Sequence, residues 1–168
     1  MNLKSLKDLL IDELHNLLDA EKQLTVILPK ILARASSEEI KNLLEAHLID
    51  THNHVTRLEL ISTELRVYEL GHLCKGMKGI LDEAEDVLAA RGDSAVVDAA
   101  IVAICERIES YEIARYASAL GFAELLGSEV MAKYLHQTLA EERTAHRAFV
   151  NIAAESVNEK ADDVANFY

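Results

Sequence analysis

Two glutamates, Glu109 and Glu112, lie one helical turn apart in a stripe of otherwise apolar residues. The stripe advances in steps of three and four, which places its members on one face of an α-helix; the other members are Val102, Cys105, Tyr116, Ala119, Ala123 and Leu126. Burying a bare carboxylate is costly, and two of them on one face repel each other. The pair must therefore be protonated, paired with cations or bound to metal.

Polar residues interrupt the apolar stripes of three further segments in the same way. They are Glu21 in residues 3–35, Asp50 and His54 in 38–66, and Glu142 and His146 in 129–156. Carboxylates together with imidazoles suit iron, manganese or zinc. We therefore predict a site for two divalent metal ions, iron first and manganese or zinc as alternatives, with the ligands Glu21, Asp50, His54, Glu109, Glu112, Glu142 and His146.

Taken singly, most of these positions also have a simpler interpretation. Asp50 can hydrogen-bond Thr51 or a nearby histidine, and a lone histidine such as His54 is more often a core residue than a ligand. Basic residues close in sequence could neutralise the acids: Lys22, Arg107, Arg115 and Arg143. Tyr111 and Tyr116 are expected to pack in the core, with hydrogen bonding to the site as the alternative. The coincidence on four segments favours the metal site.

The composition indicates one all-helical domain covering residues 1–168. One proline and six glycines among many leucine, alanine, glutamate and lysine residues favour long helices. We expect four, at 3–35 (kinked or broken at Pro29), 38–66, 95–126 and 129–156, with a short helix at 77–90 and a frayed tail from about 158. Two short links form antiparallel hairpins, and the long middle connection allows a crossover. The fold class is an all-α, ferritin-like four-helix bundle with an additional short helix between the second and third long helices.

Charge and motif content exclude several classes of protein. A net charge of −12 argues against a nucleic-acid partner, and no apolar run is long enough for a membrane span. The two cysteines, Cys74 and Cys105, form no C-x-x-C motif, which argues against a zinc ribbon or a disulfide framework. The first residues lead into an amphipathic segment rather than an apolar signal region. We expect a cytoplasmic protein.

Four motifs resemble the YciE/YciF-type ferritin-like family of bacteria. They are AEKQL at 20–24, HLIDT at 47–51, ESYEIARY at 109–116 and LAEE at 139–142, and the third is the most specific. The resemblance covers nearly the whole chain. It implies a helical bundle, a homodimer and a link to stress responses.

The bundle also looks related to that of rubrerythrin. The Glu-x-x-Glu and Glu-x-x-x-His of that family match Glu109/Glu112 and Glu142/His146. Its second-helix acid and histidine are usually three residues apart, whereas Asn53 stands at that distance from Asp50, so His47 competes with His54 as a ligand.

The expected function is a di-iron stress protein that reacts with O₂ or peroxide, or that binds iron transiently. The chain lacks the cysteines of the rubrerythrin electron-transfer domain, so its electron donor is unknown. The alternative is a non-enzymatic dimeric structural or interaction bundle without functional metal chemistry.

Overall fold

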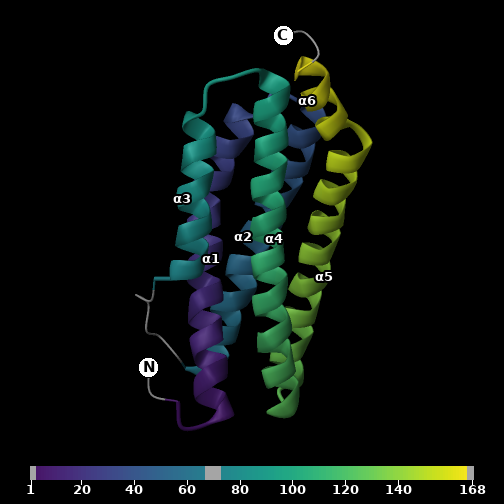
Figure 1. The fold of residues 1–168 in the computed structure, drawn as a ribbon. Coiled ribbons are helices and arrows are strands. Elements are labelled where there is room, and N and C mark those ends of the chain that lie inside the picture. Colours follow the sequence, from purple (N-terminus) through teal and green to yellow (C-terminus); the bar gives the residue numbers. More distant parts are fainter. Residues whose placement is uncertain (1–2, 67–72, 166–168) are drawn as a thin grey trace.

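A computed structural model describes residues 3–66 and 73–165 of the chain, and all its regular elements are helical (Figure 1). They are α1 (Leu6–Arg34), α2 (Glu38–Leu65), α3 (Lys75–Ala89), α4 (Ser94–Leu125), α5 (Glu129–Ile152), a π-helical turn (Ala153–Val157) and α6 (Asn158–Ala165). The four long helices and the additional short helix, α3, are confirmed. Residues 67–72 of the long middle connection lie outside the described residues.

The long helices form two antiparallel hairpins, α1 with α2 and α4 with α5. Helix α3 packs against α1 and α4 and returns the chain along the bundle before α4 begins. As a result, α2 and α4 run in the same direction (Figure 1). This crossover is the ferritin-like arrangement, so the predicted fold class is confirmed.

Side-chain caps position the starts of the helices. Ser5 Oγ accepts a hydrogen bond of 3.2 Å from the Asp8 backbone N–H and so caps the N-terminus of α1. Ser37 makes no such bond at the start of α2. Instead, the buried carboxylate of Asp98 accepts from the backbone N–H groups of Ser36 at 2.8 Å and Ser37 at 2.9 Å. This carboxylate on α4 therefore fixes the start of α2 relative to α4.

Two local expectations differ from the structure. Helix α1 continues through Pro29, which lies on its exposed side. The carbonyl left without a donor there can be solvated, so the helix does not end. The tail is helical as far as Ala165, because a π-helical turn continues α5 into α6. Gly127, at φ +72°, makes the tight turn between α4 and α5 that the sequence indicated.

The core consists of two apolar clusters separated along the bundle axis. One contains, among others, Leu24, Ile31, Ile40, Leu44, Ile101, Cys105, Phe149 and Ile152. The other contains Leu10, Leu14, Leu17, Leu58, Ile61, Tyr116, Ala119, Met131, Leu135 and Leu139, among others. Each long helix contributes to both clusters, so the residues between them lie at the same level of the bundle. Among the described residues, no helix combines the length and apolar character of a membrane span.

Candidate metal centre

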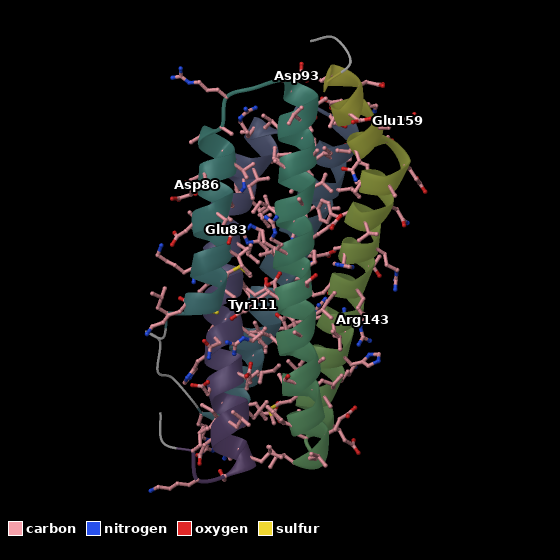
Figure 2. The ribbon with its side chains drawn as sticks, in the orientation of Figure 1. Glu83, Asp86, Asp93, Tyr111, Arg143 and Glu159 are labelled. Carbon is pink, nitrogen blue, oxygen red and sulfur yellow. The ribbon has the colours of Figure 1, made fainter. Side chains whose placement is uncertain are left out.

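Six polar side chains fill the level between the two apolar clusters, and each is at most 3% exposed. They come from all four long helices: Glu21 from α1, His47 and His54 from α2, Glu109 and Glu112 from α4, and Glu142 from α5. Other acids, such as Glu83, Asp86 and Glu159, project from the outside of the bundle (Figure 2). The interior acids are therefore a separate set and not part of the charged surface.

These six side chains form two groups that share Glu142. The first contains His47, Glu109, Glu112 and Glu142, and the second contains Glu21, His54 and Glu142. Within each group, one potential ligand atom from each residue lies within 4.8 Å of all the others. Two donors on opposite sides of a metal ion lie up to about 4.4 Å apart, so the spread within each group is close to that of a coordination shell.

The closest contacts within the two groups are made by the histidines. His47 Nε2 lies 3.1 Å from Glu109 Oε1. His54 Nδ1 lies 2.8 Å from Glu142 Oε1 and 3.3 Å from Glu21 Oε1. The histidines therefore face the carboxylates from the α2 side of the bundle.

Apart from the short histidine–carboxylate contacts given above, most polar atoms of this set have no hydrogen-bond partner among the described residues. This holds for both oxygens of Glu109, Glu112 and Glu142, for Glu21 Oε2, for both nitrogens of His47 and for His54 Nδ1. Buried polar atoms without partners cost roughly 1–3 kcal/mol each, and more when charged. Metal coordination would satisfy them, and the mixed carboxylate and imidazole donors suit iron, manganese or zinc. The residues present therefore fit a di-metal site.

Burial and mutual repulsion make ionisation of the α4 carboxyl groups unfavourable. Burial, followed by the charges of Glu142 and Glu21, raises the pKa of Glu109 well above its ordinary value. The pKa of Glu112 is raised in the same way by burial and by the charges of Glu21, Glu142 and Glu109. Without a cation nearby, burial and repulsion therefore favour the protonated form of both side chains.

His54 behaves differently from His47, although both are buried. Burial disfavours the imidazolium of His54, but the adjacent Glu142 and Glu21 carboxylates outweigh it and raise the pKa of His54 to about 10. His54 in turn holds the pKa of Glu142 below its ordinary value despite burial. Burial lowers the pKa of His47, which disfavours its imidazolium form. Among the described residues of the metal-free site, the His54 imidazolium thus pairs with the carboxylates of Glu142 and Glu141.

Groups outside the set hold two of its members in place. His54 Nε2 lies 3.0 Å from Glu141 Oε2 and donates to it, which leaves Nδ1 directed at the second group. Arg57 holds Glu141 with two hydrogen bonds, of which that from Nη2 to Oε1 measures 3.1 Å. On the opposite side, the hydroxyl of Tyr116 donates to Glu21 Oε1 at 2.5 Å.

Comparison with known proteins places this bundle in a family. Residues 5–162 match the family DUF892, described as a domain of unknown function. The chain is also 34% identical over 166 residues to protein YciF of Escherichia coli K12, covering 98% of this chain and all of that protein. The chain belongs to the DUF892 family. The resemblance seen in the sequence motifs is confirmed.

Solved structures show the same fold in this family. The crystal structure of the E. coli stress protein YciF matches with a TM-score of 0.87 and 32% identity, covering 93% of this chain and 99% of that one. YcfI of Rhodopseudomonas palustris, provisionally described as a structural protein, matches with a TM-score of 0.84 and 32% identity, covering 88% and 94%. A Xanthomonas campestris protein at 17% identity and TM-score 0.75 shares the fold, covering 96% and 99%.

Five of the seven predicted ligands lie in the two groups of this DUF892 chain: Glu21, His54, Glu109, Glu112 and Glu142. Asp50 and His146 do not, and both are half-buried. On a helix with 100° per residue, Asp50 is turned about 60° away from His47, whereas His54 is turned only about 20°. His146 is displaced about 6 Å along α5 from Glu142. Its Nε2 lies 3.2 Å from Ser110 Oγ on α4.

His47 joins the first group, so both histidines that competed in the sequence lie in the centre. Three of the four basic residues that could have neutralised the acids are engaged elsewhere. Lys22 pairs with Glu59 at 2.8 Å, Arg107 with Glu83 at 3.6 Å and Arg115 with Glu13 at 2.7 Å. The simpler interpretation of the acids as locally paired is therefore wrong for Glu21 and the Glu109/Glu112 pair.

Two supporting residues of the centre, Glu141 and Arg57, were not predicted. Glu142 stands between Glu141 and Arg143 in the sequence, a pattern that is typical of a charged helix surface. A sequence signal does exist. Arg57 follows His54 by three positions, so both lie on adjacent parts of α2, and Glu141 precedes the ligand Glu142. The pairing itself depends on how α2 and α5 meet.

Proposed function

We propose that this DUF892 protein is a ferritin-like di-metal carboxylate protein whose resident metal is iron. The observation that carries the proposal is the set of six buried side chains with unpartnered polar atoms, arranged in two groups around Glu142. Four ionised carboxylates carry the charge that two divalent cations balance. Metal binding would therefore remove the repulsion that raises the pKa values of Glu109 and Glu112.

Each of the two ligand groups would bind one metal ion. His47, Glu109 and Glu112 would hold one ion, Glu21 and His54 would hold the other, and Glu142 would bridge them. Two ferrous ions bound there would supply the electrons for reducing O₂ or a peroxide. Glu141 and Arg57 keep His54 oriented with Nδ1 inward, and the Tyr116 hydroxyl steadies Glu21. The surrounding apolar clusters limit the access of water to this level.

The biological setting follows from the family. A relative described as a stress protein, at 32% identity and with nearly complete coverage, supports a role in stress responses for this chain. The homodimer and the cytoplasmic location remain proposals, and two buried free cysteines suit a reducing compartment. The competing function is a structural bundle without metal chemistry, in keeping with the provisional description of the R. palustris relative.

Metal counting separates these two functions. The purified protein is stripped with a chelator, reconstituted anaerobically with ferrous iron, manganese or zinc, and freed of unbound metal before elemental analysis. We expect two ions per chain, one for each ligand group, with iron retained. Fewer than about one ion per two chains after reconstitution would contradict the proposal, since a formed ligand set of this kind binds tightly. That outcome would favour the structural bundle.

A further inference from the structure

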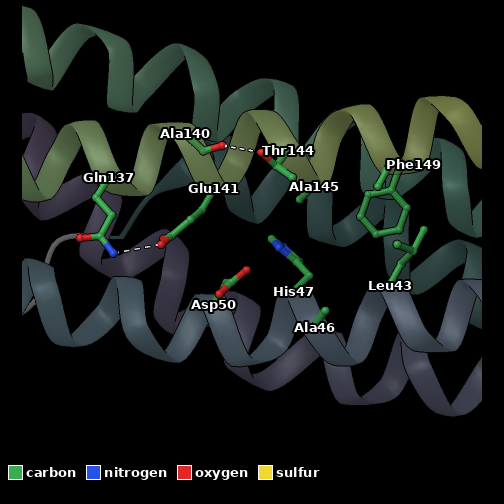
Figure 3. Close-up of a pocket in the computed structure, with 11 residues that line it drawn as sticks. Leu43, Ala46, His47, Asp50, Gln137, Ala140, Glu141, Thr144, Ala145 and Phe149 are labelled. Atoms are coloured by element: carbon green, nitrogen blue, oxygen red, sulfur yellow. Dashed lines mark hydrogen bonds between the residues drawn. The ribbon is translucent and has the colours of Figure 1, made fainter.

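A cleft of about 420 Å³ lies between α2 and α5, directly beside the candidate centre. Figure 3 shows that its two ends differ in character. Gln137, Glu141 and Asp50 lie toward one end, and Leu43 and Phe149 lie at the other. His47 lies between them, and it belongs both to the wall of the cleft and to the first ligand group. This imidazole therefore connects the cleft to the buried carboxylates.

Asp50 is the free acid of this cleft. Glu141, the other carboxylate in the wall, is held by Arg57 and His54. No lysine or arginine of the described residues forms an ion pair with Asp50, and none lines the cleft. The negative charge of Asp50 acts on both His47 and Glu109, so it is close enough to influence the first group. Asp50 thus presents an uncompensated negative charge one turn from His47.

The approaches along the bundle axis are closed. The two apolar clusters cover the centre on either side, and their members are almost completely buried. A hydrated cation would lose its water shell there without gaining any ligand. The polar end of the α2–α5 cleft offers a carboxylate and then an imidazole, whose two nitrogens have no hydrogen-bond partner among the described residues.

We propose that divalent cations enter the centre through the polar end of this cleft, captured first by Asp50 and passed by His47 to Glu109, Glu112 and Glu142. The inference rests on the proposed di-metal function. It gives Asp50 a role outside the final ligand set, as a carboxylate on the path. Electrostatic steering by such a charge changes rates of association by about tenfold or more and depends on ionic strength.

The first test measures the rate of cation uptake and not the activity. Metal-free protein is mixed with Co²⁺ at low ionic strength, and the ligand-field absorption of the bound ion is followed by stopped flow. We expect Asp50→Asn to slow uptake at least about fivefold and to lose most of the salt dependence. The matched control is Glu45→Gln, which removes one exposed acid from the same helix outside the cleft.

The number of metal ions bound at the end of the reaction shows whether Asp50 only lies on the entry path or is itself a metal ligand. Asp50→Asn should reach the wild-type count after long incubation, because Asp50 lies outside both ligand groups. A lower final count would make Asp50 a ligand and overturn the proposal. Equal uptake rates for Asp50→Asn and Glu45→Gln would also overturn it. A wild-type protein that takes up no cation at all would contradict the di-metal function itself.

A second pair of variants tests the cleft as the route. Ala140 lies in the cleft wall beside Glu141 and is exposed, so Ala140→Leu adds bulk at the polar end of the cleft and leaves its charges unchanged. Ala117→Leu makes the same change at an exposed site on α4. We expect several-fold slower uptake in Ala140→Leu alone, with both variants as helical as the wild type by circular dichroism. Uptake in Ala140→Leu at the rate of Ala117→Leu would exclude this route.

Discussion

Replacing Glu142 with glutamine is expected to empty both metal sites in one step, because this carboxylate belongs to both ligand groups. An amide retains one oxygen donor but removes the negative charge. Even partners outside the ligand shell contribute about 10–100-fold to metal affinity, so losing a shared ligand should weaken both sites by at least about 100-fold. Equilibrium dialysis against buffered metal followed by elemental analysis measures the loss.

Two further variants make this result specific. Glu21→Gln affects the second group alone and should leave close to one ion per chain. Glu124→Gln removes an exposed acid from α4 and should leave both. Circular dichroism of the metal-free proteins verifies that each bundle is formed. A normal metal count in folded Glu142→Gln would contradict the assignment of Glu142 as the bridging ligand.

The second large effect is a dependence of stability on pH that metal reverses. Glu21, Glu109 and Glu112 have raised pKa values in the fold, so above pH 4.5 the unfolded chain loses these protons first and the free energy of unfolding falls. The pKa of His54 is raised to about 10, so its contribution is full below 6.5 and is lost as the pH rises toward 10.

Two groups act with the opposite sign, but only at lower pH. The lowered pKa of His47 costs stability below 6.5, and the stability that the lowered pKa of Glu142 contributes is lost as the pH falls below 4.5. Between pH 6.5 and 9 the other described groups of the centre therefore all lower the free energy of unfolding as the pH rises. The melting temperature of the metal-free protein should fall steadily over this range.

Metal should raise the melting temperature most at the alkaline end of this range, where the carboxyl groups give up their protons most readily. A ligand at about 100 times its Kd stabilises by about 2.7 kcal/mol. For a chain of this size that corresponds to roughly 5–10 °C per site. Differential scanning calorimetry at pH 6.5 and 9, with and without metal, measures both effects.

The Glu112→Gln variant should change the melting temperature of the protein in opposite directions with and without metal. It removes an ionisable group whose deprotonation is unfavourable in the fold, so it should stabilise the metal-free protein at pH 9. It should also abolish the part of the metal-dependent increase that the first ligand group contributes and leave the part that the second group contributes. Each unit by which the pKa is raised is worth about 1.4 kcal/mol, which makes the stabilisation measurable. An undiminished metal effect in Glu112→Gln would show that the thermal shift arises elsewhere.

The sequence predicts the helices well because local rules determine their ends. Apolar residues at steps of three and four define the buried faces, and Ser5, Asp93 and Gly127 mark helix boundaries in the way their chemistry requires. The start of α2 at Glu38 agrees with the predicted range of 38–66, but the group that caps it could not be predicted in this way. Its cap is Asp98, which is about 60 positions away along the chain and reaches Ser36 and Ser37 only through the packing of α4.

The site was predictable to the level of the helix face but not to that of the individual side chain. Glu109 and Glu112 stand at the centre of the apolar stripe of α4, and no cationic side chain near them in sequence neutralises them. Asp50 also lies at a step of three or four from the other members of the apolar stripe of α2. In the structure it lies at the edge of that stripe and lines the α2–α5 cleft. Whether a residue at the edge of an apolar stripe reaches the centre of the bundle depends on how its helix crosses the neighbouring helix. The spacing of residues along one helix carries no information about that crossing.

The most direct test of the di-metal centre is the crystal structure of iron-loaded protein with anomalous diffraction data on both sides of the iron absorption edge. We predict two anomalous peaks inside the bundle. One should lie about 2.0–2.2 Å from donor atoms of His47, Glu109, Glu112 and Glu142, and the other at the same distances from Glu21, His54 and Glu142. An intact bundle with these six side chains in place and no anomalous peak between the two apolar clusters would contradict the account.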